Sequence, residues 1–143
     1  MSDANKQVVL EYLRALEQGD RARLCDLLTP DVVAWGPGQR ICVRGFDDWC
    51  EATFDPAFSN ETIRVDDLIA DGDRVVLRYT MEVRQIGEAL GRPGTGKRIV
   101  NSGIKIYRLR DGRIAELWGE QDMIGLLGEL GVRAIPEEWV PKD

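Results

Sequence analysis

The sequence predicts one α+β domain, in which N-terminal helices cover the apolar face of an antiparallel sheet. In the first part of the chain apolar residues recur with helical spacing, whereas in the second half they alternate with strand spacing. Short turn-forming sequences separate the predicted strands. The 143 residues fit a single domain over residues 1–143, and a content of 43% hydrophobic residues is enough to form a core.

The N-terminal part of the chain predicts two consecutive helices. Ser2 and Asp3 are candidate caps of the first helix, which ends at Gly19. The apolar face of this helix is formed by Val8, Val9, Tyr12, Leu13 and Leu16. Asp20 begins a shorter helix, which Pro30 interrupts. The apolar face of the second helix is formed by Leu24, Leu27 and Leu28.

Two short strands and a third helix are predicted next. The strands cover residues 31–35 and 40–44, on either side of the turn Gly36-Pro37-Gly38. The apolar residues that follow share one helical face and are Phe46, Trp49, Cys50 and Phe54. We therefore expect the third helix to lie on the core beside the first two.

The second half of the chain predicts four strands and a final short helix. The strands cover residues 61–70, 74–86, 97–109 and 113–121. Their connections are Asp71-Gly72-Asp73, a Gly/Pro loop over residues 87–96, and Asp111-Gly112. The apolar residues of the final helix are Met123, Ile124, Leu126, Leu127 and Leu130. Strands in this order form an antiparallel meander, and the helices must cover its apolar face.

Composition excludes several classes of function. A net charge of −6 disfavours a nucleic-acid-binding protein, which needs a basic face. The polar N-terminal segment MSDANKQ is not a secretory signal, and no run approaches the roughly 18 apolar residues of a membrane span. The three cysteines have neither metal-binding nor disulfide spacing. We expect a cytoplasmic protein that binds neither nucleic acid nor a membrane.

The chain contains no histidine, and this restricts its chemistry further. Ser-His-Asp and Cys-His nucleophiles are excluded, as are zinc sites that depend on histidine. Proton transfer near neutral pH must therefore use Asp, Glu, Lys, Tyr, Cys or bound water. An apolar pocket brings a carboxyl group into the range for proton transfer, because desolvation disfavours the anion.

Several segments carry a family resemblance when taken in order. They are GPG, VRGFDDW, AFSNETIRVDDLIADGDRVVLRYT, GEALGRPGTGKRIVNSGIKIYRLRDGRIAELW and DMIGLLGELG. Together they resemble the SnoaL-like polyketide cyclases of the NTF2-like group. The resemblance implies a cone, in which a curved sheet and the helices enclose a pocket, and a homodimer that forms through the outer sheet face. Some members of the family close rings by an intramolecular aldol step, and others are linked to hydroxylation or epoxide opening.

The resemblance also points to individual residues. The cyclases carry an acidic residue just after the final tryptophan of the sheet, and Asp122 corresponds to it here. They tend to carry a histidine in the long strand, where this chain has Gln85, which cannot accept a proton near pH 7. If the last strand continues to position 122, the two-residue period places on one side of it Ile114, Glu116, Trp118, Glu120 and Asp122. That side is either a solvated edge or part of the pocket lining.

The long strand offers a second acidic candidate. Glu82 either points inward, held by Arg84 or Arg78, or belongs to a polar face turned to water or to a partner subunit. Limonene-epoxide hydrolases, a neighbouring NTF2-like family, use two aspartates bridged by an arginine. A loose alignment places their acidic positions near Glu82 and Glu120, but the bridging arginine falls at Thr80. The resemblance to these hydrolases is therefore partial.

The leading hypothesis is a metal-free and cofactor-free enzyme acting on a small, largely apolar carbonyl or polycyclic compound by aldol cyclisation or isomerisation. Asp122 is its expected general acid/base, aided by Glu82 or Glu120. The expected substrate-binding residues are Trp35, Trp118, Arg84, Gln85 and Asn101. One alternative is an epoxide hydrolase that uses Glu82 and Glu120. The other is a non-catalytic ligand-binding or assembly module.

Overall fold

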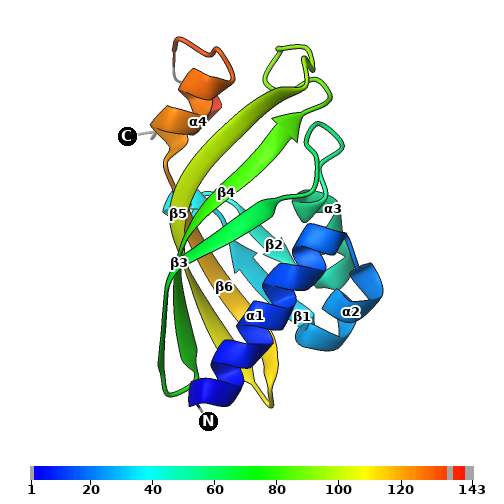
Figure 1. Ribbon diagram of the computed structural model, residues 1–143, viewed down its shortest axis with the longest axis vertical. Helices are drawn as coiled ribbons and strands as arrows, with labels where there is room; N and C mark the ends of the chain where they lie inside the picture. The colour runs from blue at the N-terminus through cyan, green and yellow to red at the C-terminus, as the bar shows by residue number, and fades with distance from the viewer. Residues whose placement is uncertain (1, 135–136, 141–143) are drawn as a thin grey trace.

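The computed structural model describes residues 2–134 and 137–140, which form a curved, unclosed sheet with helices on its concave face (Figure 1). The helices are α1 (Ser2–Gln18), α2 (Arg21–Leu27), α3 (Phe46–Thr53) and α4 (Met123–Glu129), with 3-10 turns η1 (Pro37–Gln39) and η2 (Glu137–Trp139). The strands are β1 (Leu28–Trp35), β2 (Cys42–Arg44), β3 (Thr62–Asp71), β4 (Arg74–Gln85), β5 (Lys97–Arg110) and β6 (Arg113–Gln121). The predicted α+β class is confirmed.

The sheet has the strand order β2-β1-β6-β5-β4-β3. Strands β3 to β6 form the predicted antiparallel meander, whereas β1 joins β6 in a parallel pairing that the sequence did not predict. Strand β1 also begins earlier than expected, at Leu28, and runs through Pro30. The pairing of β1 with β6 shifts between Leu28 and Val33. This irregularity accommodates Pro30, which has no N–H to donate to a neighbouring strand.

The core lies between α1, α3 and the concave face of the sheet. Alternation along β4 turns Val75, Leu77, Tyr79, Met81 and Val83 toward the helices, and all five are buried. Tyr12 of α1 connects the two layers, because its ring centroid lies 6.0 Å from that of Trp49 and 5.5 Å from that of Tyr107. The helices thus cover the apolar face, as predicted from the strand pattern.

A second, smaller cluster holds α4 against the far end of β4 and β5. Val83, Ile99 and Leu130 form its buried centre, and Phe58 and Leu126 pack on it. In Figure 1, α4 lies at the top, away from the other helices. The part of the chain that the structure describes has no helix both long and apolar enough to cross a membrane.

Candidate active site

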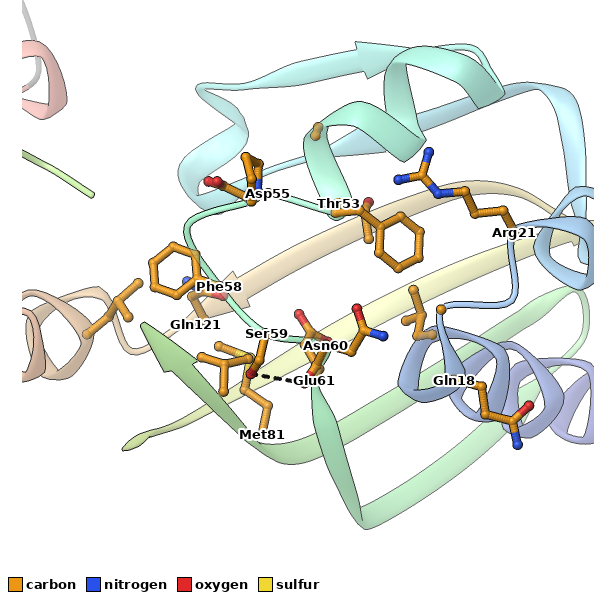
Figure 2. A pocket seen from close by; sticks show the side chains of 17 residues that line it. Gln18, Arg21, Thr53, Asp55, Phe58, Ser59, Asn60, Glu61, Met81 and Gln121 are labelled. Atoms are coloured by element: carbon orange, nitrogen blue, oxygen red, sulfur yellow. Dashed lines mark hydrogen bonds between the residues drawn. The ribbon is translucent and has the colours of Figure 1, made fainter. Parts of the chain in front are cut away.

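Two adjoining cavities lie between the helices and the concave face of the sheet. One, of about 580 Å³, lies beside the loop over residues 54–61, and we call it the loop cavity (Figure 2). The other, of about 300 Å³, contains Lys105, and we call it the Lys105 cavity. The residues that line both are Leu16, Ala52, Thr53, Glu61 and Gln121. The two cavities therefore adjoin, and we refer to them together as the hollow.

Lys105 lies on β5 in the same alternation as the buried residues Tyr107 and Leu109. Its inward direction is possible because it pairs with Gly119 on β6. A Cβ atom at Gly119 would lie 3.5 Å from Cε and 3.6 Å from Cγ of Lys105. The lysine stem therefore lies across the space that a side chain at position 119 would otherwise occupy.

Three phenol rings surround the Lys105 amine, and they are all the tyrosines of the chain. Tyr12 comes from α1, Tyr79 from β4 and Tyr107 from β5. The Nζ atom of Lys105 lies 5.5 Å from the centroid of the Tyr79 ring. The Tyr107 hydroxyl is buried and has no hydrogen-bond partner among the described residues. The site thus combines one amine with phenols from three different elements.

The environment fixes the protonation of this group. Burial raises the pKa of Tyr12 to about 12, and burial likewise raises the pKa of Tyr79 and of Tyr107. For Lys105, burial acts to lower the pKa, whereas the tyrosine oxygens, once ionised, and the Glu61 carboxylate act to raise it, and the net shift is upward. At neutral pH the three phenols are protonated, and the Lys105 amine is an ammonium ion that faces the Glu61 carboxylate.

Glu61 is the carboxylate that faces this group. It lies directly before β3 and lines both cavities. The start of β3 is attached to the end of α1, because the N–H of Ile63 donates to Glu17 Oε1 at 3.2 Å. Figure 2 shows Glu61 beside Asn60, on the same side of the loop cavity as Met81. Glu61 and Lys105 share the Lys105 cavity, but they form no ion pair within the described part of the chain.

The structure places Asp122 differently from the buried position that was expected. Its carboxylate is exposed and caps α4 by accepting the N–H of Gly125 at 2.9 Å. The neighbouring Glu120 is also exposed and accepts the N–H of Gly38 at 2.8 Å. Both line an outer groove of about 480 Å³, together with Arg64, Asp66, Arg78 and Thr80. Neither carboxylate lines the hollow. The catalytic role expected for Asp122 and Glu120 stays a prediction.

Glu82 points away from the hollow, so of the two orientations considered for it the structure has the outward one and not the inward one with Arg84 or Arg78. The neighbouring Met81 and Val83 occupy the inward positions, which leaves Glu82 on the outer face. There its Oε1 accepts the Nε–H of Arg98 at 2.6 Å. Arg84 is exposed and donates to the carbonyl of Gly96 at 3.0 Å. The pair Glu82 and Glu120, considered for epoxide hydrolysis, is therefore not assembled in the hollow.

Of the two tryptophans predicted to bind substrate, one lines the hollow. Trp35 lines the Lys105 cavity, and its indole N–H donates to Glu116 Oε2 at 2.9 Å. Trp118 lies on the outer side of β6, where the guanidinium carbon of Arg74 is 5.4 Å from its ring centroid. Glu116 lies on the outer face and Trp35 is in register with Trp118, so the Trp35 indole is directed to that face. The substrate contacts expected for both tryptophans stay predictions.

The two predicted amide donors are buried but hold loops. The amide nitrogen of Gln85 donates to the carbonyls of Gly87 and Arg92, which fixes the loop between β4 and β5. Asn101 donates to the backbone carbonyl of Asp122 at 2.8 Å. Neither side chain lines the loop cavity or the Lys105 cavity. Their predicted contact with a substrate is untested.

Sequence reasoning did not single out Lys105, Glu61 or the individual tyrosines. A signal for Lys105 was present, because it occupies a position of β5 that alternation with Tyr107 and Leu109 assigns to the apolar face. Glu61 gave no such signal, since it lies in a loop whose path depends on packing. Within the described residues, no group of three His, Cys, Asp or Glu side chains could hold a metal ion.

The chain is similar in sequence and in fold to known proteins. The family model of the SnoaL-like domain matches residues 9–117. Among curated proteins, no sequence matches the chain. Solved structures, in contrast, include several that are similar over nearly the whole length.

Three structures from Streptomyces illustrate this similarity. TsrD of Streptomyces laurentii is 30% identical, with 92% of this chain and 98% of TsrD covered and a TM-score of 0.77. IdmH of Streptomyces antibioticus, a proposed polyketide cyclase, is 28% identical, with 90% and 99% covered and a TM-score of 0.76. AclR of Streptomyces galilaeus, a proposed hydroxylase, is 27% identical, with 95% and 100% covered and a TM-score of 0.79.

Proposed function

Because this chain belongs to the SnoaL-like family, we propose that it is an acid–base enzyme that enolises a small, largely apolar carbonyl compound. The relatives named above include a proposed cyclase and a proposed hydroxylase, so their names do not select one reaction. The choice rests on the site, as it must in a fold that supports many chemistries. The observation that carries it is the position of Glu61 where the two cavities meet.

In the proposed reaction, the Glu61 carboxylate removes a proton from the carbon next to a carbonyl group. The electron pair of the broken C–H bond moves into the enolate. Return of the proton at another carbon of a conjugated enolate completes an isomerisation. In an aldol closure the enolate carbon attacks a second carbonyl, whose π electrons move to its oxygen, and the proton held by Glu61 passes to the resulting alkoxide. Leu16, Met81 and Val83 give the loop cavity an apolar side, against which the hydrocarbon part of the substrate would pack.

Exchange of an α-proton tests this function without knowledge of the natural substrate. The probe is 2-tetralone in deuterated buffer, and proton NMR follows the loss of the signal from its α-protons. We expect Glu61→Gln to lower the protein-dependent exchange rate by about a hundredfold, because the amide cannot accept the proton. Glu51→Gln is the matched control, since Glu51 is exposed on α3 and does not line the hollow.

The same assay decides between Glu61 and the acid predicted from the family resemblance. A hundredfold loss with Asp122→Asn and an unchanged rate with Glu61→Gln would return the catalytic role to Asp122. An exchange rate no higher with the wild-type protein than in buffer, together with binding of the ketone, would support a non-catalytic ligand-binding module.

We also propose that the protein forms a homodimer through the outer sheet face. The support is a row of apolar side chains on β5, in which Val100 is 40% exposed, Ile104 49% and Ile106 36%. A second copy of the chain would cover this row. Light scattering should give twice the chain mass for the wild type and the chain mass for Ile104→Asp. A wild-type monomer at all concentrations would contradict the proposal.

A further inference from the structure

The Lys105 cavity contains a charged group for which proton removal by Glu61 gives no role. We propose that this cavity is an oxyanion site, in which the Lys105 ammonium binds the enolate or phenolate oxygen of a planar, conjugated ligand, with Tyr12 beside it in the cavity wall. The inference rests on the proposed function, because an enolate is the anion that Glu61 would generate. The oxyanion site adds the chemical class of the ligand and the residue that holds its oxygen.

The Lys105 ammonium has spare hydrogen-bonding capacity. Its Nζ atom makes no hydrogen bond or ion pair within the described part of the chain, whereas Lys97 binds Glu129 through both kinds of contact. A lysine ammonium has three donors, and cations removed from water are normally paired. Lys105 instead lines a cavity, so an anion placed there would supply the missing partner.

Of the three tyrosines near Lys105, Tyr12 lines the Lys105 cavity, whereas Tyr79 and Tyr107 are not among its lining residues. The Tyr107 hydroxyl is buried without a partner, and the Tyr79 hydroxyl lies where a Cβ atom of Gly103 would come within 2.7 Å of it. The raised pKa values of all three tyrosines keep their hydroxyls protonated, and therefore able to donate, at neutral pH. Glycine at positions 103 and 119 leaves the room that Tyr79 and Lys105 occupy.

The size, the walls and the charges of the Lys105 cavity select the shape and charge of its ligand. A volume of about 300 Å³ is at the lower limit for small-molecule pockets, and it suits one or two fused rings. The cavity walls include Ala34, Val43, Trp49 and Leu117, which suit an apolar ring. Glu61 is the carboxylate that faces the ammonium, so a dianion such as phosphate would meet both repulsion and a high cost of desolvation. A single oxygen whose charge is delocalised over a ring fits best.

Binding of 2-naphthol, the phenol that resembles the enol of 2-tetralone, tests the inference. Naphtholate absorbs at longer wavelengths than naphthol or tyrosinate, so a pH titration reports the ionised fraction of the bound probe. We expect the protein to lower the pKa of bound 2-naphthol by at least about one unit, which means a tenfold preference for the anion. Lys105→Met should abolish this shift, whereas Lys105→Arg should retain most of it.

Three further measurements separate this role from a structural one. Lys6→Met is the matched control, because Lys6 lies on α1 outside both cavities, and it should leave the shift unchanged. Binding of 2-methoxynaphthalene, which cannot ionise, should survive in Lys105→Met and shows that the variant is folded. Glu61→Gln should enlarge the shift, because it removes the negative charge that faces the ammonium.

The outcomes for the site and for the proposed function are distinguishable. A bound naphthol with its solution pKa, or an equal shift in Lys105→Met, would overturn the oxyanion site even if Glu61 proves to be the base. A Lys105-dependent shift without α-proton exchange would keep the oxyanion site and reject the proposed catalysis.

Discussion

The two faces of the sheet hold charged side chains in opposite ways. On the outer face acids and bases are paired, as in Arg98–Glu82 at 2.6 Å, Arg64–Asp66 at 2.7 Å and Arg108–Glu116 at 3.2 Å. On the inner face, Lys105 has three tyrosines and Glu61 around it but no ion-pair partner among the described residues. The outer face has more charged residues. The ammonium of Lys105, which has no ion-pair partner in the described part of the chain, lies on the inner face.

This difference teaches where to look for chemistry in a fold of this kind. The Thr80 hydroxyl and the Arg64 guanidinium hold the pKa of Asp66 below its usual range, which keeps that outer carboxylate a constant anion. Exposed pairs of this type contribute at most about 1 kcal/mol to stability, and their charges are already neutralised. A cation that lacks a partner inside a cavity is retained against its desolvation cost, which favours a role in binding.

The largest effect expected from this comparison is a loss of stability at high pH. A pKa of about 12 for Tyr12, against 10.0 ordinarily, means that the folded state holds the phenolic proton more tightly. The raised pKa therefore adds about 3 kcal/mol to the free energy of unfolding. This stabilisation is complete below pH 10 and disappears as the pH rises to 12. Urea unfolding between pH 8 and 11.5 measures it, at roughly half-unit steps. Tyr12→Phe should make the curve less steep without abolishing the pH dependence, because the pKa values of Tyr79 and Tyr107 are also raised. An equally steep curve would contradict this assignment.

The next effect concerns the two inner glycines, which are not equivalent. A Cβ atom at Gly103 would lie 2.5 Å from the Glu120 carbonyl oxygen, whereas at Gly119 the nearest atom would be 3.5 Å away. We therefore expect Gly103→Ala to lower the free energy of unfolding by about 2–3 kcal/mol, since the backbone of β6 must shift. Gly119→Ala should change it by less than about 1 kcal/mol in either direction. Chemical denaturation compares the two, and equal values would show that the close approach at Gly103 does not matter.

A smaller effect of opposite sign is expected for the lysine itself. Lys105→Met keeps most of the apolar stem and removes a charge that lacks a partner, so we expect the free energy of unfolding to rise by about 1 kcal/mol. The same variant should lose the naphtholate preference described above. A clear loss of stability in urea would mean that Lys105 is a structural group and would blur the contrast between the two faces.

The smallest effect is expected on the outer face. Glu82→Gln removes one side of the pair with Arg98, in which the two side chains are 37% and 61% exposed. The free energy of unfolding should change by less than about 1 kcal/mol. Naphthol binding should not change at all, and a change in the naphthol titration would show that the two faces are coupled.

The sequence predicted the elements well, because each has a clear period and a clear end. Gly19 ends α1 with a φ of 65°, and the meander from β3 to β6 follows from alternation and short turns. The parallel pairing of β1 with β6 was not predictable, because no short connection joins these strands in sequence. Such pairings depend on how the sheet closes around the helices.

The site was predicted less well, and the reason is the parity of the strands. The two-residue period grouped on one side of the last strand Ile114, Glu116, Trp118, Glu120 and Asp122. In the structure Ile114 is buried in the core, Glu120 is exposed, and Asp122 lies after the end of β6 as the N-cap of α4. The register shift between β5 and β6 breaks the simple two-residue period on which that grouping depended. The loop position of Glu61 has no periodicity from which its direction could be inferred.

The placement of Lys105 in one of two adjoining cavities has a consequence for selectivity. A guest whose oxygen contacts the ammonium and which extends past the shared residues would place its remainder beside the loop over residues 54–61. Substituents at that far end meet the wider space and are tolerated, whereas bulk next to the bound oxygen is rejected. The protein would then discriminate between regioisomers by which end of the molecule carries the bulk.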